Sequence, residues 1–149
     1  FNSIHERLIA AWKRIGENRL GKVHFAAMAN QPEDFITVEY LRDTAIQAGF
    51  KTSFLDVTDV GWDRARKVFV DNTGFPVHRC FKLYPWEWMF REEFGPHLRT
   101  APTKWVEPPW KAILSCKSIL PMLYEKFPDS PFLLPASFDP LPSGSYVRK

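Results

Sequence analysis

Apolar residues recur at helical intervals in two early segments of the chain. The apolar positions of the first segment are Ile4, Leu8, Ile9, Trp12 and Ile15. Their spacing predicts an amphipathic helix that ends near Asn18. A second helix is predicted from Pro32 to Ala48, because proline suits the first helical position and Gly49 suits the position after the last turn.

Two short apolar runs flank the second predicted helix. Residues 22–28 and 51–57 each have the length of a buried strand and end at polar or turn-forming residues. A strand, a helix and a second strand in this order form a βαβ unit, whose two strands pair in parallel. The fold class predicted for this part of the chain is therefore α/β, with a Rossmann-like βαβ module.

The middle of the chain predicts a β-hairpin followed by a short helix. Residues 67–71 and 75–83 alternate or run apolar on either side of Asn72-Thr73-Gly74, which favours a tight turn between antiparallel strands. Pro85 then favours the start of a helix, which Gly95-Pro96 should end.

A change in composition after residue 100 predicts a module boundary. Residues 101–110 are rich in proline and are expected to form an ordered loop. A helix is predicted over 115–127, and a strand over 146–148. The predicted modules are therefore 1–100 and 101–149.

Composition narrows the classes of function. The 149 residues are 45% hydrophobic and carry a formal net charge of +3 with no run of like charge. A globular domain is therefore expected, and nucleic acid is not an expected partner. The sequence shows no leader and no apolar run of the roughly 18 residues that a membrane span needs. We accordingly expect a cytoplasmic protein that acts on small molecules away from membranes.

The sequence lacks several common signatures of catalytic and metal sites. Neither GxGxxG nor GxxxxGK[ST] occurs, and the four histidines and two cysteines do not have the spacing of metal ligands. We therefore predict no metal ligand and no catalytic nucleophile within the chain.

Two acidic residues and two lysines are candidates for ligand binding. Glu33 and Asp34 follow a predicted strand and open a helix, in the crevice where open α/β sheets bind ligands. They either hold a cationic amine or only complement the positive end of the helix, which contributes about 0.3–1 kcal/mol. Lys117, predicted in the first turn of its helix, either binds an anion there or is a solvated lysine. If Lys149 projects from its predicted strand toward the same anion, the two lysines together would hold a nucleotide.

An aromatic stretch supplies the third candidate. In KLYPWEWMFRE, residues 82–92, one carboxylate, Glu87, stands among four aromatic side chains. It either meets a substrate or borders an aromatic core, and the stretch alone leaves both interpretations open.

Several long phrases of the sequence resemble the glutathionylspermidine synthase family. They are PEDFITVEYLRDTAIQAGF at 32–50, FKLYPWEWMFREEF at 81–94, WVEPPWKAILSCKSILPMLYEKFP at 105–128, FLLPASFD at 132–139 and YVRK at 146–149. The resemblance implies an ATP-grasp carbon–nitrogen ligase. In such an enzyme, ATP and Mg²⁺ convert the carboxylate of glutathione to an acyl phosphate, which the amine of spermidine attacks. The second module then resembles part of the nucleotide-binding lid.

The resemblance also implies roles for the candidates. Lys117 and Lys149 match lysines that contact ATP, and the acids at 33 and 34 resemble those of the amine pocket. Glu87 and Trp88 match the phrase that lines the acid-substrate pocket. Because characterised synthases have a threonine at the position of Trp88, we expect an acid other than glutathione itself.

The family's Mg²⁺ ligands are expected outside these residues. The chain is therefore expected to be an internal fragment of a larger ligase and to be inactive alone. The alternative function is a non-catalytic ligand-binding module that retains the fold but lacks the ligase chemistry.

Overall fold

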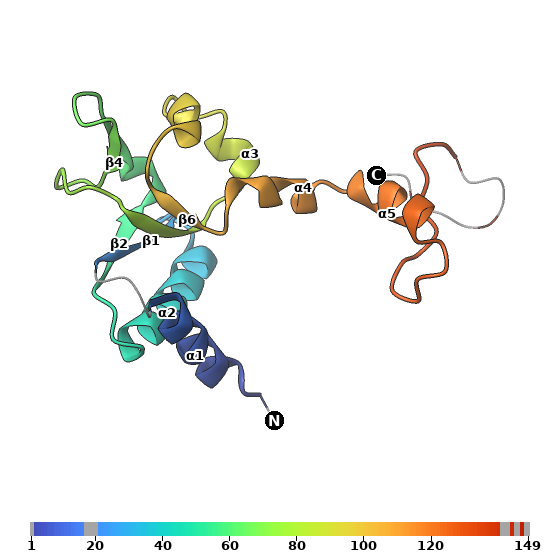
Figure 1. The fold of residues 1–149 in the computed structure, drawn as a ribbon, viewed down its shortest axis with the longest axis horizontal. Coiled ribbons are helices and arrows are strands. Elements are labelled where there is room, and N and C mark those ends of the chain that lie inside the picture. Colours follow the sequence, from blue (N-terminus) through green and yellow to red (C-terminus); the bar gives the residue numbers. More distant parts are fainter. Residues whose placement is uncertain (1, 17–20, 141–143, 145–146, 148–149) are drawn as a thin grey trace. The chain divides into compact units, whose positions relative to one another are not determined.

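A parallel β-sheet with the strand order β2-β1-β5-β6 organises the first part of the chain (Figure 1). Its strands are β1 (Val23–Ala27), β2 (Thr52–Asp56), β5 (Arg79–Leu83) and β6 (Lys104–Val106). A separate antiparallel hairpin pairs β3 (Gly61–Asp63) with β4 (Val68–Val70). This computed structural model describes residues 2–16, 21–140, 144 and 147.

Helices complete the two units into which the chain divides, Phe1–Pro109 and Trp110–Lys149. The α-helices are α1 (Ile4–Gly16), α2 (Pro32–Gln47), α3 (Trp86–Met89), α4 (Ala112–Ser115) and α5 (Ile119–Lys126). Short 3-10 helices span Val57–Asp59, Gly95–Arg99 and Pro109–Lys111. The first unit extends to residue 109 because β6 lies where the sequence predicts a loop.

The predicted βαβ module is confirmed. Strand β1, helix α2 and strand β2 follow one another, and β1 pairs with β2 in parallel, with Phe25 opposite Phe54. Strand β1 is central and buried along its whole length, which explains why its residues read as a continuous apolar run.

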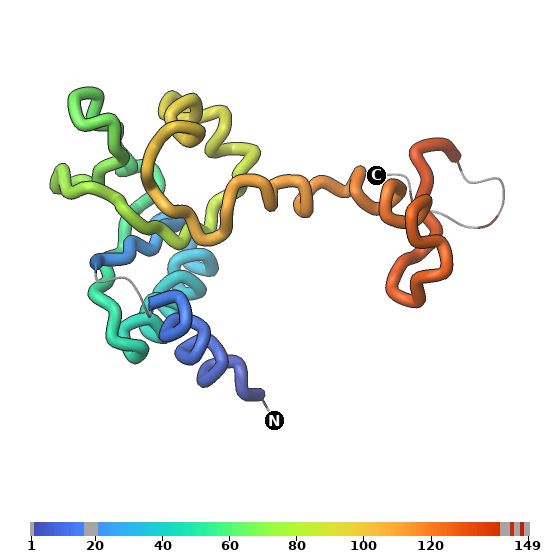
Figure 2. The backbone as a smooth tube through the Cα atoms, viewed as in Figure 1, coloured from blue at the N-terminus to red at the C-terminus, as the bar shows by residue number. Residues whose placement is uncertain are grey.

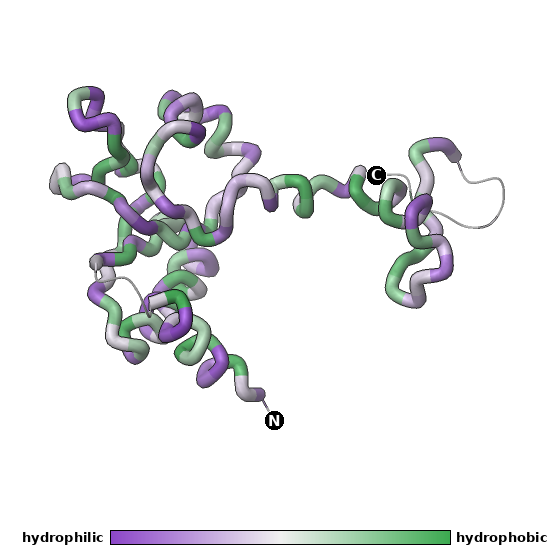
Figure 3. The backbone as a smooth tube through the Cα atoms, viewed as in Figure 1, coloured by the Kyte–Doolittle hydropathy of each residue, from purple (hydrophilic) through white to green (hydrophobic). Residues whose placement is uncertain are grey.

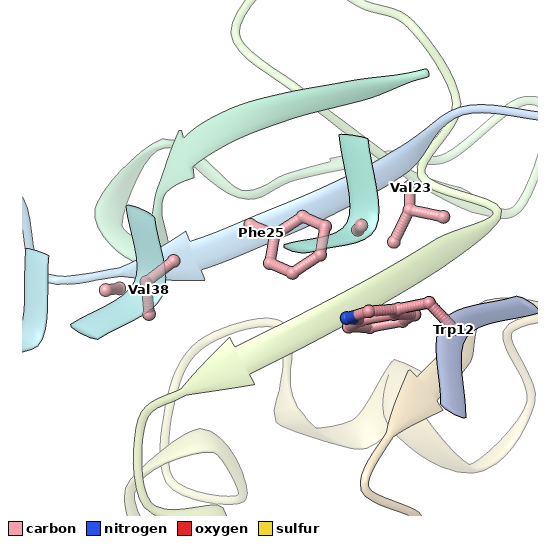
Figure 4. Close-up of a cluster of buried hydrophobic side chains, with 6 residues drawn as sticks. Trp12, Val23, Phe25 and Val38 are labelled. Atoms are coloured by element: carbon pink, nitrogen blue, oxygen red, sulfur yellow. The ribbon is translucent and has the colours of Figure 1, made fainter. Parts of the chain in front are cut away.

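Helices α1 and α2 cover one face of the sheet and enclose its main core (Figure 4). Phe25 projects from β1 into this core, where its ring meets the ring of Trp12 with centroids 5.4 Å apart. Trp12 is buried although it is an indole, because its Nε1 donates a hydrogen bond to Thr44 Oγ1 at 3.1 Å. The bond therefore ties α1 to α2 across the core.

The hairpin and α3 lie on the other side of the sheet (Figure 1). Phe69 of β4 packs edge-on against Trp105 of β6, with ring centroids 5.6 Å apart. Trp86 of α3 meets the same ring at 5.7 Å. Both faces of the sheet are therefore covered, as parallel sheets require.

The predicted hairpin between residues 67–71 and 75–83 does not form, because its first strand pairs with another strand. Strand β4 pairs with β3, which the sequence analysis missed, and β5 joins the main sheet parallel to β1. Figure 2 shows the chain turning between β4 and β5. The predicted turn at Asn72-Thr73-Gly74 exists, but its two sides form a single β-bridge, between Val70 and Pro76, and no ladder of paired strands.

The helix predicted to run from Pro85 to residue 94 is shorter in the structure. It ends at Met89, and a turn leads into the 3-10 helix at Gly95–Arg99. A side chain at Gly95 would place its Cβ 2.5 Å from the carbonyl oxygen of Phe90. The chain folds back on itself there, and only glycine permits the close approach.

The helix predicted over 115–127 is broken in two. Pro121 explains the break, because proline has no N–H to donate and its ring would clash with the carbonyl of Lys117 in a continuous helix. The Leu120 amide donates to that carbonyl instead, at 3.0 Å. Lys117 therefore precedes α5 and does not occupy the first turn of a helix. The strand predicted at 146–148 lies largely outside the described residues.

Apolar residues, coloured green in Figure 3, lie along α4 and α5 of the second unit, and several of their side chains are exposed. Ile113 is 63% exposed and Met122 is 61% exposed. Among the described residues from 110 onward, no residue is buried. This part of the chain therefore has no core of its own.

A buried polar cluster holds the loop after β4 against the amino end of β1. The carboxylate of Asp71 accepts hydrogen bonds from His24 Nε2 at 3.0 Å and Lys22 Nζ at 3.1 Å. The backbone and hydroxyl of Thr73 and the amide of Phe75 also donate to it. Burial alone would raise the pKa of Asp71, but these donors together hold it well below its usual value.

We expect Trp12→Ala to lower the free energy of unfolding by about 3–5 kcal/mol, because it leaves a cavity in the main core. Urea unfolding followed by circular dichroism measures the change. Trp110→Ala is the matched control, since that ring is 63% exposed, and it should change the free energy by less than about 0.5 kcal/mol. Equal losses for the two substitutions would contradict the packing described for Trp12.

Stability should also fall on acidification through His24. Burial lowers the pKa of His24 below 6.5, and the hydrogen bond with Asp71 opposes this only in part. The unfolded chain therefore binds a proton more readily, so stability is complete above pH 6.5 and falls as the pH drops below it. The low pKa of Asp71 adds a second loss below pH 3.8.

Urea midpoints measured from pH 7.5 downward, in steps of about half a pH unit, test this expectation. His24→Gln should flatten the slope below pH 6.5, while His78→Gln, at an exposed position, should keep it. A slope that survives His24→Gln would show that another group is responsible.

Candidate functional site

The candidate site is the carboxyl edge of the parallel sheet. Because its strands run in the same direction, their carboxyl ends meet at one edge, where open α/β sheets bind ligands. The loop after β1 leads to Glu33 and Asp34, and the loop after the neighbouring β5 leads to Glu87 and Trp88. The structure thus brings two of the predicted residue pairs to the same edge.

The turn between β1 and α2 is fixed by a carboxylate that the sequence analysis missed. Asp56, at the carboxyl end of β2, accepts a hydrogen bond from the Ala29 amide at 3.1 Å. Its other oxygen accepts from the amide and hydroxyl of Thr58, at 2.9 and 2.7 Å. Burial would raise the pKa of Asp56, but these bonds lower it. The sequence feature that could have identified Asp56 is an aspartate at the end of a predicted strand, just before a turn.

Glu33 and Asp34 occupy the first turn of α2. Glu33 is exposed and Asp34 is half-buried, so both carboxylates can reach a ligand. The residue that precedes the helix, Gln31, provides no side-chain cap. Complementing the helix end and holding a cation therefore both fit this geometry.

The aromatic stretch divides into a buried part and an exposed part. Trp86 is buried and packs on Trp105, whereas Trp88 is 54% exposed. The ring of Trp88 meets Tyr84 edge-on at 5.4 Å. The Tyr84 hydroxyl donates to Glu92 Oε1 at 2.7 Å, and this bond raises the pKa of Tyr84. Glu87 is exposed at the same edge.

A buried lysine lies beneath the exposed residues Glu87 and Trp88, which form the rim of the site. The sequence analysis missed this lysine. Lys82 of β5 is 7% exposed, and its Nζ donates to the Tyr84 carbonyl at 2.7 Å. The ammonium also lies 4.0 Å from the centroid of the Trp86 ring. Burial lowers the pKa of Lys82, and the nearby carboxylates of Glu107 and Glu87 oppose the shift. A lysine between the apolar residues Phe81 and Leu83 of a strand was the sequence feature that could have identified it.

The chemistry of this edge suits ligands with cationic groups. Carboxylates beside an exposed tryptophan face attract ammonium groups by charge and by cation–π interaction. The hydrogen-bonded side chains beneath the rim limit how far the exposed ones can move. The edge can therefore bind and orient a small polar substrate.

The predicted ATP-binding lysines belong to the second unit of the chain. Lys117 is exposed in the second unit, between α4 and α5. Lys149 lies outside the described residues, so its predicted role has no geometry to support it.

Within 2–16, 21–140, 144 and 147, no group of three or more His, Cys, Asp or Glu side chains is arranged to hold a metal ion. None of the helices in these ranges has the length and apolar character to cross a membrane.

Comparison with known proteins places this sequence in a family. All of residues 1–149 match the family described as glutathionylspermidine synthase preATP-grasp. A Haemophilus influenzae protein named as a proposed acid–amine ligase is 42% identical over 143 residues, which cover 94% of this chain and 36% of that protein.

Two more distant relatives have names that state an activity. Trypanothione synthetase of Crithidia fasciculata is 27% identical over 99% of this chain and 26% of its own length. The bifunctional glutathionylspermidine synthetase/amidase of Escherichia coli is 28% identical over 88% of this chain and 24% of its own length. The chain thus spans about a quarter to a third of the relatives it matches. It belongs to the glutathionylspermidine synthase preATP-grasp family.

Proposed function

We propose that the protein containing these residues is an ATP- and Mg²⁺-dependent ligase that joins a carboxylic acid to an amine through an acyl phosphate. The acid is glutathione-like and the amine is spermidine-like. Both substrates are small molecules, and neither nucleic acid nor a membrane takes part. This proposal rests on family membership together with the residues at the carboxyl edge.

The observation that carries the proposal is the meeting of two residue pairs at one sheet edge. Glu33 and Asp34 follow β1, Glu87 and Trp88 follow β5, and these strands are parallel neighbours. We assign the first pair to the amine and the second to the acid. Ligation requires both substrates to be held side by side, and neighbouring strand ends provide such an arrangement.

Trp88 bears on the identity of the acid. Its exposed indole is bulkier than the threonine of characterised synthases and offers a ring N–H instead of a hydroxyl. We therefore infer that the acid differs from glutathione near this residue.

The nucleotide and the metal depend on other parts of the protein. Lys117 and Lys149 are the proposed ATP contacts. Lys117 is exposed, and ammonium groups suit phosphate oxygens. The described residues do not fit a Mg²⁺ site by themselves, so we infer ligands outside this chain. The chain alone is therefore proposed to be inactive.

A phosphate-release screen of the full-length protein against pairs of acids and amines tests the function. The proposal expects release from ATP that depends on Mg²⁺ and on both substrates together. Binding of an acid or amine without any ATP turnover would instead favour a non-catalytic ligand-binding module.

Lys117→Ala in the full-length protein should reduce this phosphate release by at least about 100-fold, because it removes a charge from the proposed phosphate contacts. The circular dichroism spectrum should be unchanged, since the side chain is exposed. Lys126→Ala is the matched control, because Lys126 is an exposed lysine at the end of α5. Equal activity of the two variants would remove Lys117 from the site.

A further inference from the structure

Lys82 occupies an unusual place for a lysine. It lies in β5 opposite Ala26 of the central strand, and its side chain is on the face covered by α3. A buried ammonium loses favourable interactions with water, so the site must provide partners or the position would favour an apolar residue. Both partners recorded for its Nζ lie just beyond the end of its own strand.

These two partners define the turn from β5 into α3. The Tyr84 carbonyl accepts the hydrogen bond, and the Trp86 ring faces the ammonium at 4.0 Å. Trp86 Nε1 has no hydrogen-bond partner within the described chain. Its ring is consequently held by stacking and by the cation.

Helix α3 needs these contacts for its stability, because it spans only the four residues Trp86–Met89 and has no side-chain cap. A single turn of this length is not stable on its own. The same turn carries Glu87 and Trp88 at the rim, and Tyr84 links Lys82 to Trp88 by its carbonyl on one side and its ring on the other.

We propose that Lys82 is a positioning residue for the acid-substrate pocket: its buried ammonium fixes the β5–α3 turn and thereby the orientation of Glu87 and Trp88. The assignment of the pocket to the acid rests on the proposed function. The role of Lys82 in fixing the β5–α3 turn does not rest on the proposed function, because it follows from the contacts of Lys82 with Tyr84 and Trp86.

Two carboxylates complete the surroundings of the ammonium. Glu107, which directly follows β6, and Glu87 both stabilise the charged form of Lys82. The charge thus lies among groups from β5, α3 and the end of β6. Removing it should release the turn while the core beneath α1 and α2 is unaffected.

The test uses full-length protein labelled with 5-fluorotryptophan, in which the Trp88 signal is identified by its loss in Trp88→Phe. Lys82→Met keeps much of the apolar stem and removes the charge. Lys104→Met is the matched control, because Lys104 lies in the adjacent β6 and is exposed. Glu107→Gln is the second test variant, since it removes one carboxylate at an exposed position.

Lys82→Met should move or split the Trp88 fluorine signal, and Glu107→Gln should move it in the same direction by less. Lys104→Met should leave it unchanged. With the acid that gives the fastest phosphate release in the substrate screen, Lys82→Met should raise the KM for that acid by about 10- to 100-fold and leave the KM for ATP unchanged. A purely structural role would lower stability without this selectivity.

An unmoved Trp88 signal in folded Lys82→Met would overturn the proposal. If Lys82→Met does not fold, Lys82→Gln, which also removes the charge, is measured in its place, and an unmoved Trp88 signal in that folded variant overturns the proposal equally. Absence of phosphate release with every pair of substrates would contradict the ligase function, and the fluorine result would still decide the role of Lys82.

Discussion

The parallel pairing of β1 with both β2 and β5 is the constraint on which the rest of the structure depends. It requires crossover connections, which provide α2 on one side and the hairpin β3–β4 on the other. It also brings the strand ends that precede Glu33 and Glu87 to one edge. A hairpin between β4 and β5 would have removed β5 from this sheet and separated the two groups of candidate residues.

Because both faces of the sheet are buried, the polar residues His24 and Lys82 in its strands mark positions where the fold provides a partner. Apolar strands of a covered sheet tolerate a charge only where partners are available. His24 and Lys82 lie in adjacent strands on the same face, two residues apart in register, yet they serve opposite edges. His24 joins the Asp71 cluster at the amino edge, while Lys82 supports the turn at the carboxyl edge. The amino-edge cluster stabilises the loop, and the carboxyl-edge contacts orient a surface open to ligands.

The sequence was sufficient to predict the elements whose signals are local. The helical spacing around Trp12 and the proline at position 32 predicted α1 and α2, and the βαβ order predicted the parallel pair. Long-range choices were not predictable in this way, because β5 has the same apolar pattern whether it pairs with β4 or with β1. The three-residue strand β6 is hidden among prolines. The sequence predicted that Glu33 and Asp34 follow a strand and open a helix, as they do. The position of Glu87 and Trp88 at the same edge depends on the pairing of β5 with β1, and Lys82 and Asp56 act through contacts that only the fold creates.

The central claim is that ligands bind at the carboxyl edge of the sheet. Hydrogen exchange of the full-length protein, with and without saturating spermidine, tests it most directly, and the amino-edge loop provides an internal control. The account predicts that spermidine slows exchange in residues 28–34, which carry the proposed amine contacts, and leaves exchange in 71–75 unchanged. Slower exchange confined to 71–75 would contradict it.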